Sequence, residues 1–403
     1  INLNLILSDL KLQNFDKTKN IVVDTKYFDR NSEVYKRISW MWKNELFEDN
    51  AKLDWILIKS ENFQALNTLQ DKYAWKIKTT YIDPPFNLWE NGDFMYKTDY
   101  LDWSWASLLY DRITLWKRLL SDDWSFWTRC DYNGNYIVRQ INDMVFHSWM
   151  RNEMTINRIF KNKNESKIKS LPYSNDFLML FANINFYYID PYLKLEETRK
   201  EYWRHMGDSS WQWTSKKFFW IELLPPKWNH WKYSQHKIDE KIELWELRMD
   251  CKDCWYIHYK WIIDICPKCS SVNFNPKYLV KESDVKIMWT NWTDIPWYSN
   301  FTWFSTENSE ILLKRVIQTW TLENDIVLDF FMWSATTQAT SQKLWRKYIW
   351  VEFWSQFEKF DIPRLKEVIS WKESWISKEK DVDYKWGWFF KYLYLNQYDD
   401  WFS

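Results

Sequence analysis

Glycine is almost absent from this chain: its 403 residues include 4 Gly, whereas an average composition of about 7% would give roughly 28. An apolar run of about 18 residues is also lacking, so no membrane-spanning helix and no membrane partner are expected. Lys and Arg equal Asp and Glu at 55 each, so net charge favours neither a nucleic acid nor a membrane surface. No charged-then-apolar leader opens the sequence, and we expect a cytoplasmic protein.

Tryptophan is abundant where glycine is scarce: its 34 residues, added to the glycines, slightly exceed the expected glycine number. Trp255 follows a CxxC turn, Trp333 lies in a strand-to-helix turn, and other Trp are expected in turns or at element ends, namely Trp124, Trp350, Trp386 and Trp388. Some bacteria read the UGA codon as glycine, while a common alternative table translates it as tryptophan. We therefore hypothesise that many Trp stand for glycine in the natural protein; the alternative is a chain genuinely rich in tryptophan.

Apolar patterns alternate between strand and helix spacing on both sides of a different central segment. Strands are expected in 53–60, in 76–87 as far as its double proline, and in 125–133, and helices are expected in 61–73 and 101–124. Alternation resumes near Phe304 through "SEILLKRVIQTW", "DIVLDFF", "ATSQKLW" and "KYIWVEF". Such alternation is typical of a mostly parallel sheet. We therefore predict an α/β fold with one sheet domain in two segments.

The motif "DPPF" (Asp83 to Phe86) follows a predicted strand, which its prolines end. The amino group of adenine is a poor nucleophile, because its lone pair is delocalised into the ring. The Asp83 carboxylate and Pro84 carbonyl would accept its two N–H hydrogens and free that lone pair. Phe86 would offer a flat face to a base extruded from a duplex. The alternative is an incidental strand-ending turn.

The stretch "DIVLDFFMWSATT" is predicted to be a strand, a tight turn and the start of a helix. If Trp333 stands for glycine, the turn brings backbone N–H groups and Asp329 against a cofactor at the strand's carboxyl end. Glu352 ends another strand about 20 residues later, where an acid is suited to bind ribose hydroxyls. Taken literally, Trp333 obstructs close approach of the backbone to a cofactor.

Together "YIDPPFN", "DFFMWSATT" and "GWFFKYLYLNQYDD" resemble the β-class amino-methyltransferases that act on DNA, especially the modification subunit of type III restriction systems. The resemblance covers roughly 40–160 and 285–400. It implies S-adenosylmethionine as methyl donor, adenine N6 in double-stranded DNA as acceptor, and a Rossmann-like, circularly permuted sheet. It also implies a target-recognition region between the motifs, and it allows a homodimer and a restriction subunit as partners.

Site residues are carried over by position. The catalytic motif is Asp83, Pro84, Pro85 and Phe86. The resemblance assigns cofactor binding to Asn62, Thr306, Asn308, Asp329, Phe330, Phe331, Trp333, Ser334 and Glu352. Where the family has glycine, aspartate and asparagine, this chain has Ser60, Glu61 and Asn62, so only Asn62 matches.

The resemblance and the patterns together divide the chain into five parts. These are an N-terminal extension (1–50), a first methyltransferase segment (51–157), a target-recognition region (158–290), a second methyltransferase segment (291–370) and a C-terminal segment (371–403). The basic run "KNKNESKIKS" begins the recognition region and offers tentative DNA contacts at Lys161, Lys163, Lys167 and Lys169. A solvated loop is the alternative for that run.

Four of the five cysteines form a CxxC-x11-CxxC arrangement, namely Cys251, Cys254, Cys266 and Cys269. Two such knuckles present four thiolates to Zn²⁺, whereas disulfides are rare in cytoplasmic proteins. We predict a structural zinc ribbon over 248–275, since four protein ligands leave no position for a reacting water.

Three alternatives to a restriction-associated adenine methyltransferase stay open. The same sheet serves methylation of cytosine N4, although Asp before the double proline favours adenine. A solitary methyltransferase without a nuclease partner is the second alternative. The third is a catalytically silent, zinc-stabilised DNA-binding protein, which corresponds to the literal Trp333.

Overall fold

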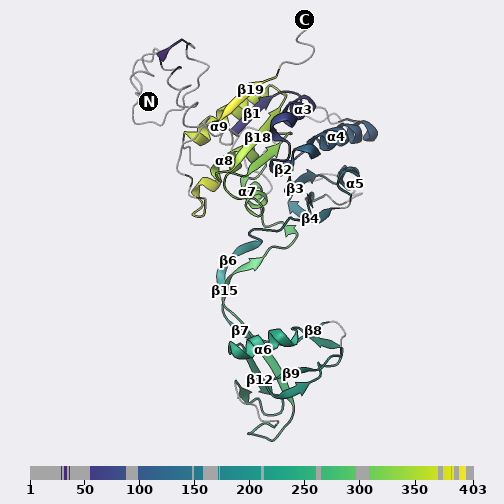
Figure 1. Cartoon of the computed structure of the whole chain (residues 1–403), viewed down its shortest axis with the longest axis vertical. Helices are drawn as coiled ribbons and strands as arrows, with labels where there is room; N and C mark the ends of the chain where they lie inside the picture. Colours follow the sequence, from purple (N-terminus) through teal and green to yellow (C-terminus); the bar gives the residue numbers. More distant parts are fainter. Residues whose placement is uncertain are drawn as a thin grey trace, which may run out of the picture. The chain divides into compact units, whose positions relative to one another are not determined.

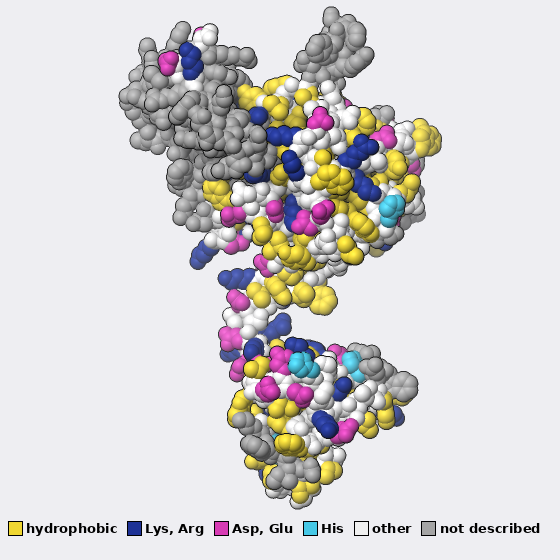
Figure 2. All heavy atoms as spheres, viewed as in Figure 1, with side chains coloured by type: hydrophobic (Ala, Val, Ile, Leu, Met, Phe, Trp, Pro, Cys, Tyr) yellow, Lys and Arg dark blue, Asp and Glu magenta, His cyan; other side chains and the backbone are white. Residues whose placement is uncertain are grey.

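The chain forms two compact units in the computed structural model, a sheet unit (Ile1–Pro191 with Trp289–Ser403) and an inserted unit (Tyr192–Met288). The structure describes residues 29, 31–33, 36, 55–87, 99–147, 149–157, 171, 173–209, 213–259, 265–295, 308–370, 375–382, 384 and 390–395. None of the helices in these ranges is long and apolar enough to cross a bilayer. On the face drawn in Figure 2, acidic and basic side chains are intermixed over both units.

The sheet unit is built on a mixed sheet whose strands come from both halves of the chain. In spatial order the strands are β16 (Asn291–Trp292), β4 (Met150–Asn157), β5 (Asn175–Ala182), β3 (Leu120–Cys130), β2 (Ile77–Ile82), β17 (Ile326–Asp329), β18 (Lys347–Glu352), β1 (Trp55–Lys59) and β19 (Lys391–Tyr394). Strand β5 is antiparallel to both neighbours, and the other neighbouring pairs are parallel. The predicted α/β fold with a mostly parallel sheet is confirmed.

Helices cover both faces of this sheet (Figure 1). One face packs against α3 (Asn62–Tyr73), α4 (Asp102–Trp116) and α5 (Asn135–Phe146), and the other against α7 (Glu310–Gln318), α8 (Thr336–Lys343) and α9 (Ile362–Ile369). Successive side chains of a strand point to opposite faces, so Ile56 and Ile58 join the first core and Trp55 and Leu57 the second. Short helical turns lie at Lys117–Leu119, Phe357–Asp361 and Trp375–Lys378.

The inserted unit has its own small core. A four-stranded sheet has the order β13 (Ile257–His258), β12 (Leu247–Cys251), β14 (Phe274–Val280) and β7 (Tyr202–His205), with α6 (Gln235–Glu243) beside it. Three antiparallel pairs complete the unit: β6 (Tyr192–Arg199) with β15 (Ser283–Ile287), β8 (Gly207–Ser209) with β11 (Asn229–Trp231), and β9 (Lys216–Phe218) with β10 (Ile221–Leu223). The core includes Met206, Phe218, Ile238, Met249 and Phe274.

Three expectations about local structure differ from the fold. The helix expected over 101–124 ends at Trp116, because the chain pairs with β2 from Leu120 onward and becomes β3. Trp124 and Trp350 are buried inside β3 and β18 rather than placed in turns, while Trp386 and Trp388 lie outside the described residues. Strand β5 belongs to the main sheet, so the compact inserted unit begins at Tyr192, later than the start of the 158–290 segment.

Tryptophan dominates the left-handed backbone positions of the described chain. Eleven residues other than glycine have positive φ, and six of them are Trp75, Trp228, Trp245, Trp255, Trp333 and Trp345, with φ between 52° and 69°. L-residues with a bulky side chain avoid this region, which glycine enters at little cost. The turn conformation inferred for Trp255 from the sequence is therefore confirmed.

Candidate active site

The two motifs singled out in the sequence meet at one edge of the sheet. Strands β2 and β17 are parallel neighbours, with Thr79 opposite Val327, and they end directly before Asp83 and at Asp329. The Trp333 indole N–H, from the turn after β17, donates a hydrogen bond to the Asp83 carbonyl. Residues about 250 positions apart in sequence therefore share one corner, at the carboxyl ends of the strands where α/β proteins bind ligands.

Asp83 is held by a buried polar network that the sequence did not reveal. The Asn308 amide donates to Asp83 Oδ2 at 3.0 Å, and an Arg129 guanidinium nitrogen lies 3.6 Å from the same oxygen. Arg129 also donates to Asp176 Oδ2 at 2.8 Å. Burial raises the pKa of Asp83, while the positive Arg129 and the Asn308 hydrogen bond oppose that rise.

Trp105 fixes the backbone of the DPPF motif. Its indole N–H donates to the Pro85 carbonyl at 2.8 Å, and the side chain is fully buried. A Cβ added at Gly134 would lie 2.4 Å from the Trp105 ring, so a side chain at position 134 would displace the indole. One of the four glycines therefore makes room for the tryptophan that supports the motif.

A pocket lies beside this corner. It contains about 720 Å³ of empty space, a figure that includes open solvent. Its walls come from the starts or ends of several elements and from α4, and comprise Ser60, Glu61, Asn62, Pro85, Tyr100, Leu108, Arg112, Phe330, Phe331, Trp333, Val351, Glu352, Phe353 and Trp354. Pro85 of the DPPF motif shares this wall with the predicted cofactor residues.

Two buried carboxylates organise the turns around the pocket. Glu352 accepts hydrogen bonds from the backbone N–H groups of Trp333 (3.1 Å), Phe353 (2.9 Å) and Trp354 (3.0 Å). Burial outweighs these bonds and raises the pKa of Glu352 to about 7. Asp329 accepts from the Phe331 N–H at 2.8 Å and the Thr337 hydroxyl at 3.1 Å, and burial raises its pKa well above the usual range.

Asn62 and its neighbours form a further part of the pocket wall. The Asn62 amide donates to the Phe330 carbonyl at 3.1 Å, and Arg112 donates to both Asn62 and Glu61. Glu61 also caps α3 by accepting from the Phe63 N–H at 2.7 Å. Ser60 and Glu61, which depart from the family pattern, thus line the pocket beside the matching Asn62.

The remaining predicted residues have different positions. Asn308 contacts Asp83 and Arg129 instead of lining the pocket. Ser334 is buried beneath the turn, where its carbonyl accepts from Arg364 at 2.7 Å. Thr306 and the basic set Lys161, Lys163, Lys167 and Lys169 lie outside the described residues. Sequence reasoning missed Arg129, Asp176, Arg112 and the Trp105 hydrogen bond.

Comparison of this chain with known proteins identifies its family. A family model described as DNA methylase matches residues 77–360. The chain is 26% identical over 417 residues to the probable type III restriction-modification enzyme HindVI Mod subunit of Haemophilus influenzae, covering 87% of this chain and 55% of the relative. It is 21% identical over 165 residues to the EcoP15I Mod subunit of Escherichia coli, covering 34% and 25% respectively.

The chain thus spans about half of the first relative and a quarter of the second. Among solved structures, a complex of M1.HpyAVI with SAM is 14% identical, with a TM-score of 0.38 and coverage of 77% of this chain and 99% of that one. The matched region extends from β2 through the inserted unit to the residues after Glu352, and so contains both motifs of the shared corner. The chain belongs to the DNA methylase family.

Proposed function

We propose that the protein is a site-specific DNA methyltransferase that uses S-adenosylmethionine to methylate adenine N6. The observation that carries the proposal is the shared corner, where the DPPF motif and the pocket meet through Pro85 and Trp333. The family match and the similarity to two Mod subunits support the same activity.

The side chains that line the pocket suit S-adenosylmethionine. Glu352, Asn62 and Glu61 place polar side chains on its wall, and Phe330, Phe331 and Phe353 place aromatic ones there, a mixture typical of sites for small polar-aromatic ligands. Glu352 would accept hydrogen bonds from the ribose hydroxyls of the cofactor, and Phe331 would contact the cofactor's adenine ring. S-adenosylmethionine, when bound, supplies a methyl group on a sulfonium that is already a good leaving group.

The chain's own contribution to the reaction lies in Asp83 and its neighbours. The Asp83 carboxylate and Pro84 carbonyl would accept the amino hydrogens of the target base and localise the nitrogen lone pair. Arg129 and Asn308 orient the buried carboxylate and oppose the rise in its pKa that burial causes. Phe86, half-buried beside the two buried prolines, would stack on the extruded base.

The finer assignments follow from the resemblance and the topology. Because β2 precedes β17 in the chain yet lies beside it in the sheet, we infer the circularly permuted order of segments. The inserted unit (192–288), with the basic run that precedes it, is assigned to target recognition. A restriction subunit and a second copy are the proposed protein partners, and action on cellular DNA would place the protein in the cytoplasm.

Paired variants test the proposal in protein carrying Trp333→Gly. Asp83→Ala should lower methyl transfer by at least roughly 10²–10³-fold, since it removes one acceptor for the amino group, and should leave S-adenosylmethionine binding unchanged. Asp329→Ala should instead weaken cofactor binding, because it releases the turn. Nucleoside analysis of the methylated DNA separates adenine N6 from cytosine N4; retained methylation in Asp83→Ala would refute the catalytic assignment.

One observation favours a catalytically silent protein. In the chain as written, the Trp333 indole lines the pocket and bridges to Asp83, so it fills the corner between the motifs. Calorimetric binding of S-adenosylmethionine to the chain as written and to its Trp333→Gly variant distinguishes the two functions. Binding restored by the glycine supports the enzyme, and absence of binding in both variants supports the silent scaffold.

A further inference from the structure

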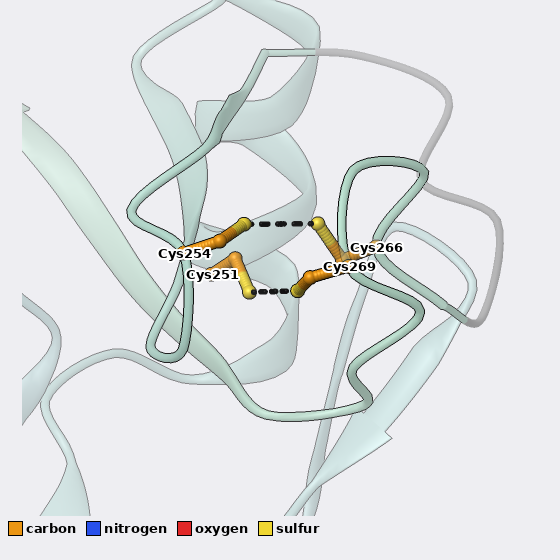
Figure 3. A group of neighbouring side chains, drawn as sticks. All are labelled: Cys251, Cys254, Cys266 and Cys269. Carbon is orange, nitrogen blue, oxygen red and sulfur yellow. Dashed lines mark hydrogen bonds between the residues drawn. The ribbon is translucent and has the colours of Figure 1, made fainter.

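Four cysteine side chains converge in the inserted unit (Figure 3). The sulfur atoms of Cys251, Cys254, Cys266 and Cys269 all lie within 4.8 Å of one another. The pairs Cys251–Cys269 and Cys254–Cys266 are each separated by 3.5 Å. Tetrahedral Zn²⁺ with Zn–S bonds of about 2.3 Å places its sulfurs roughly 3.8 Å apart, so the four thiols already have the spacing of a zinc site.

The two CxxC knuckles share one backbone geometry. In the first knuckle, the Trp255 N–H donates to the Cys251 carbonyl at 3.0 Å and the Cys251 N–H to the Tyr256 carbonyl at 2.9 Å. In the second, the matching bonds are Ser270 to Cys266 at 2.8 Å and Cys266 to Ser271 at 2.7 Å. Trp255 and Ser270, each directly after the second cysteine, both have left-handed φ values of 60° and 58°. This repeated turn aims both pairs of thiols at one point.

Neither core packing nor disulfide bonding accounts for the cluster as fully as a bound metal does. Packing alone would bury all four thiols, but Cys269 is exposed and Cys254 half-buried. Disulfide bonds require sulfurs about 2.0 Å apart, well below the 3.5 Å found for both close pairs. A set of four thiolates selects zinc or another soft metal over magnesium and calcium.

We propose that the inserted unit binds one structural Zn²⁺ through these four cysteines. Cys251 ends β12, and the second knuckle leads into β14, which pairs with β12. The metal would therefore join the two chain segments that flank this strand pair, and Cys251 and Cys266 belong to the unit's small core. Because the binding energy of such a site is folding energy, folding of the inserted unit would depend on zinc. This inference goes beyond the proposed function.

Metal analysis of the purified full-length chain tests the site. We expect one zinc per chain by plasma mass spectrometry, and loss of that zinc in the double variant Cys254→Ser, Cys269→Ser. Cys130→Ser is the matched control, because Cys130 is buried in the sheet unit and is not one of the four clustered cysteines. Equal zinc in the double variant and the wild type, or a zinc-free wild type with four reactive thiols, would overturn the proposal.

Cobalt substitution tests the same site in the unmutated chain, in case the double variant fails to fold. One equivalent of Co²⁺ added to zinc-depleted protein should give the thiolate charge-transfer and visible bands of a tetrahedral four-sulfur site. Titration without those bands would contradict the ligand set. Neither readout depends on methyl transfer, so failure of this site and failure of the proposed function are distinguishable.

A second inference rests on the left-handed tryptophans. Three of them directly follow the capping residues of helices: Trp75 after α3, Trp245 after α6 and Trp345 after α8. After α6, the Trp245 N–H donates to the Ile242 carbonyl at 3.2 Å, and the Glu246 N–H donates to the Lys241 carbonyl at 2.8 Å. After α8, the Trp345 N–H donates to the Gln342 carbonyl at 3.1 Å, and the Arg346 N–H donates to the Ser341 carbonyl at 2.9 Å. This pair of bonds defines the Schellman motif, whose left-handed residue is usually glycine.

Four of the six left-handed tryptophans expose more than half of their side chains, whereas Trp333 bonds to the Asp83 carbonyl and Trp345 contacts Tyr384. Trp75, Trp228, Trp245 and Trp255 are 70%, 65%, 55% and 78% exposed, so a large apolar group occupies a strained backbone position without burial. Trp105 and Trp116 show the opposite pattern, because both indoles are fully buried and donate hydrogen bonds to Pro85 and to Thr80. The chain therefore contains two structurally distinct classes of tryptophan.

We infer that Trp75, Trp228, Trp245, Trp255, Trp333 and Trp345 are glycine in the natural protein, whereas Trp105 and Trp116 are tryptophan. Peptide mass spectrometry of the protein isolated from cells that encode it should find glycine at the six left-handed positions and tryptophan at the two buried ones. Tryptophan at all six positions would overturn the inference. Glycine at Trp105 and Trp116 as well would contradict the structural distinction.

Discussion

Glu352 is a buried acid whose ionisation is linked to the stability of the fold. Its folded pKa of about 7 lies above the ordinary value of 4.5 because of burial. A raised pKa contributes stability that is complete below about pH 4.5 and is lost as pH rises through about 7. At about 1.4 kcal/mol per pKa unit, the loss attributable to Glu352 is about 3 kcal/mol.

This linkage predicts a difference between the wild type and Glu352→Gln. Between pH 5 and pH 8, the free energy of unfolding should fall less steeply in Glu352→Gln, because the glutamine has no proton to lose. Asp83 and Asp329 also have raised pKa values and remain in both proteins, and the Glu352 charge contributes to the rise at Asp329. Urea titrations across this pH range measure the slopes; parallel profiles would show that Glu352 ionises normally in the fold.

Trp105 is predicted to position the catalytic motif. Trp105→Phe removes the N–H that holds the Pro85 carbonyl, and small displacements of reacting groups can cost about 10²-fold in rate. We expect a fall in kcat of roughly ten- to a hundredfold, with the affinity for S-adenosylmethionine unchanged. Both kcat and the affinity are measured in protein that also carries Trp333→Gly.

Trp292→Phe is the matched control for a general loss of stability. The Trp292 side chain is also buried, and its indole N–H donates to the Trp289 carbonyl at 2.8 Å. It lies in β16, at the far edge of the sheet from β17 and the pocket. Equal losses of kcat in the two variants would mean that Trp105 acts only through stability.

Which site residues could be predicted depended on local sequence. Asp83 and Asp329 were each predicted at the carboxyl end of a strand, a pattern that allows the two residues to share one crevice. Arg129, Asp176 and Asn308 come from three separate segments and meet only in the folded sheet. The sequence did not reveal their network, because no local periodicity connects the three residues.

At the scale of elements, prediction succeeded where local pattern and tertiary pairing agree. The short strands β2, β17 and β18 and the helices α3, α7 and α8 appear where apolar periodicity placed them. The segment 117–124 continued a helical pattern, yet after the helical turn Lys117–Leu119 it becomes the start of β3, because Leu120 pairs with Ile77 of the neighbouring strand. Tertiary pairing thus overrode local propensity.

The ends of helices α6 and α8 yield a stability prediction. Trp245→Gly and Trp345→Gly should each stabilise the fold by about 1 kcal/mol, the approximate cost of a left-handed L-residue. Trp116→Gly should destabilise it by at least about 3–5 kcal/mol, because it empties a buried site in the main core and removes the bond to Thr80. Denaturant midpoints measure all three; destabilisation by the two helix-end glycines would contradict the glycine assignment.

At the scale of the whole molecule, the order of motifs predicted one sheet domain in two segments around a separate module. The sheet strands come from both sides of the compact unit Tyr192–Met288. That unit begins later than residue 158, because β5, which follows the basic run in sequence, pairs with β3 and β4 in the main sheet. The four cysteines, by contrast, were assigned from spacing alone, since a metal knuckle is a local feature.

The pocket and the cysteine cluster belong to different compact units, and this separation leads to the final prediction. The pocket is lined by residues of the sheet unit, and the cysteine cluster lies in the inserted unit. Zinc removal by a chelator should therefore leave S-adenosylmethionine binding by the Trp333→Gly protein unchanged. If the inserted unit reads the DNA target, binding of that target should fall towards the nonspecific level, roughly a thousandfold or more.

Two titrations on one zinc-depleted sample test this division, with zinc-restored protein as the control. Calorimetry reports the cofactor affinity, and fluorescence anisotropy compares target DNA with a scrambled duplex at fixed salt, because nonspecific affinity depends steeply on ionic strength. Loss of both activities would show that the two units fold as one cooperative body. Unchanged discrimination between the two duplexes would place target recognition outside the zinc-dependent fold. The reason is that a unit without its metal-linked core has no fixed surface that could recognise a base sequence.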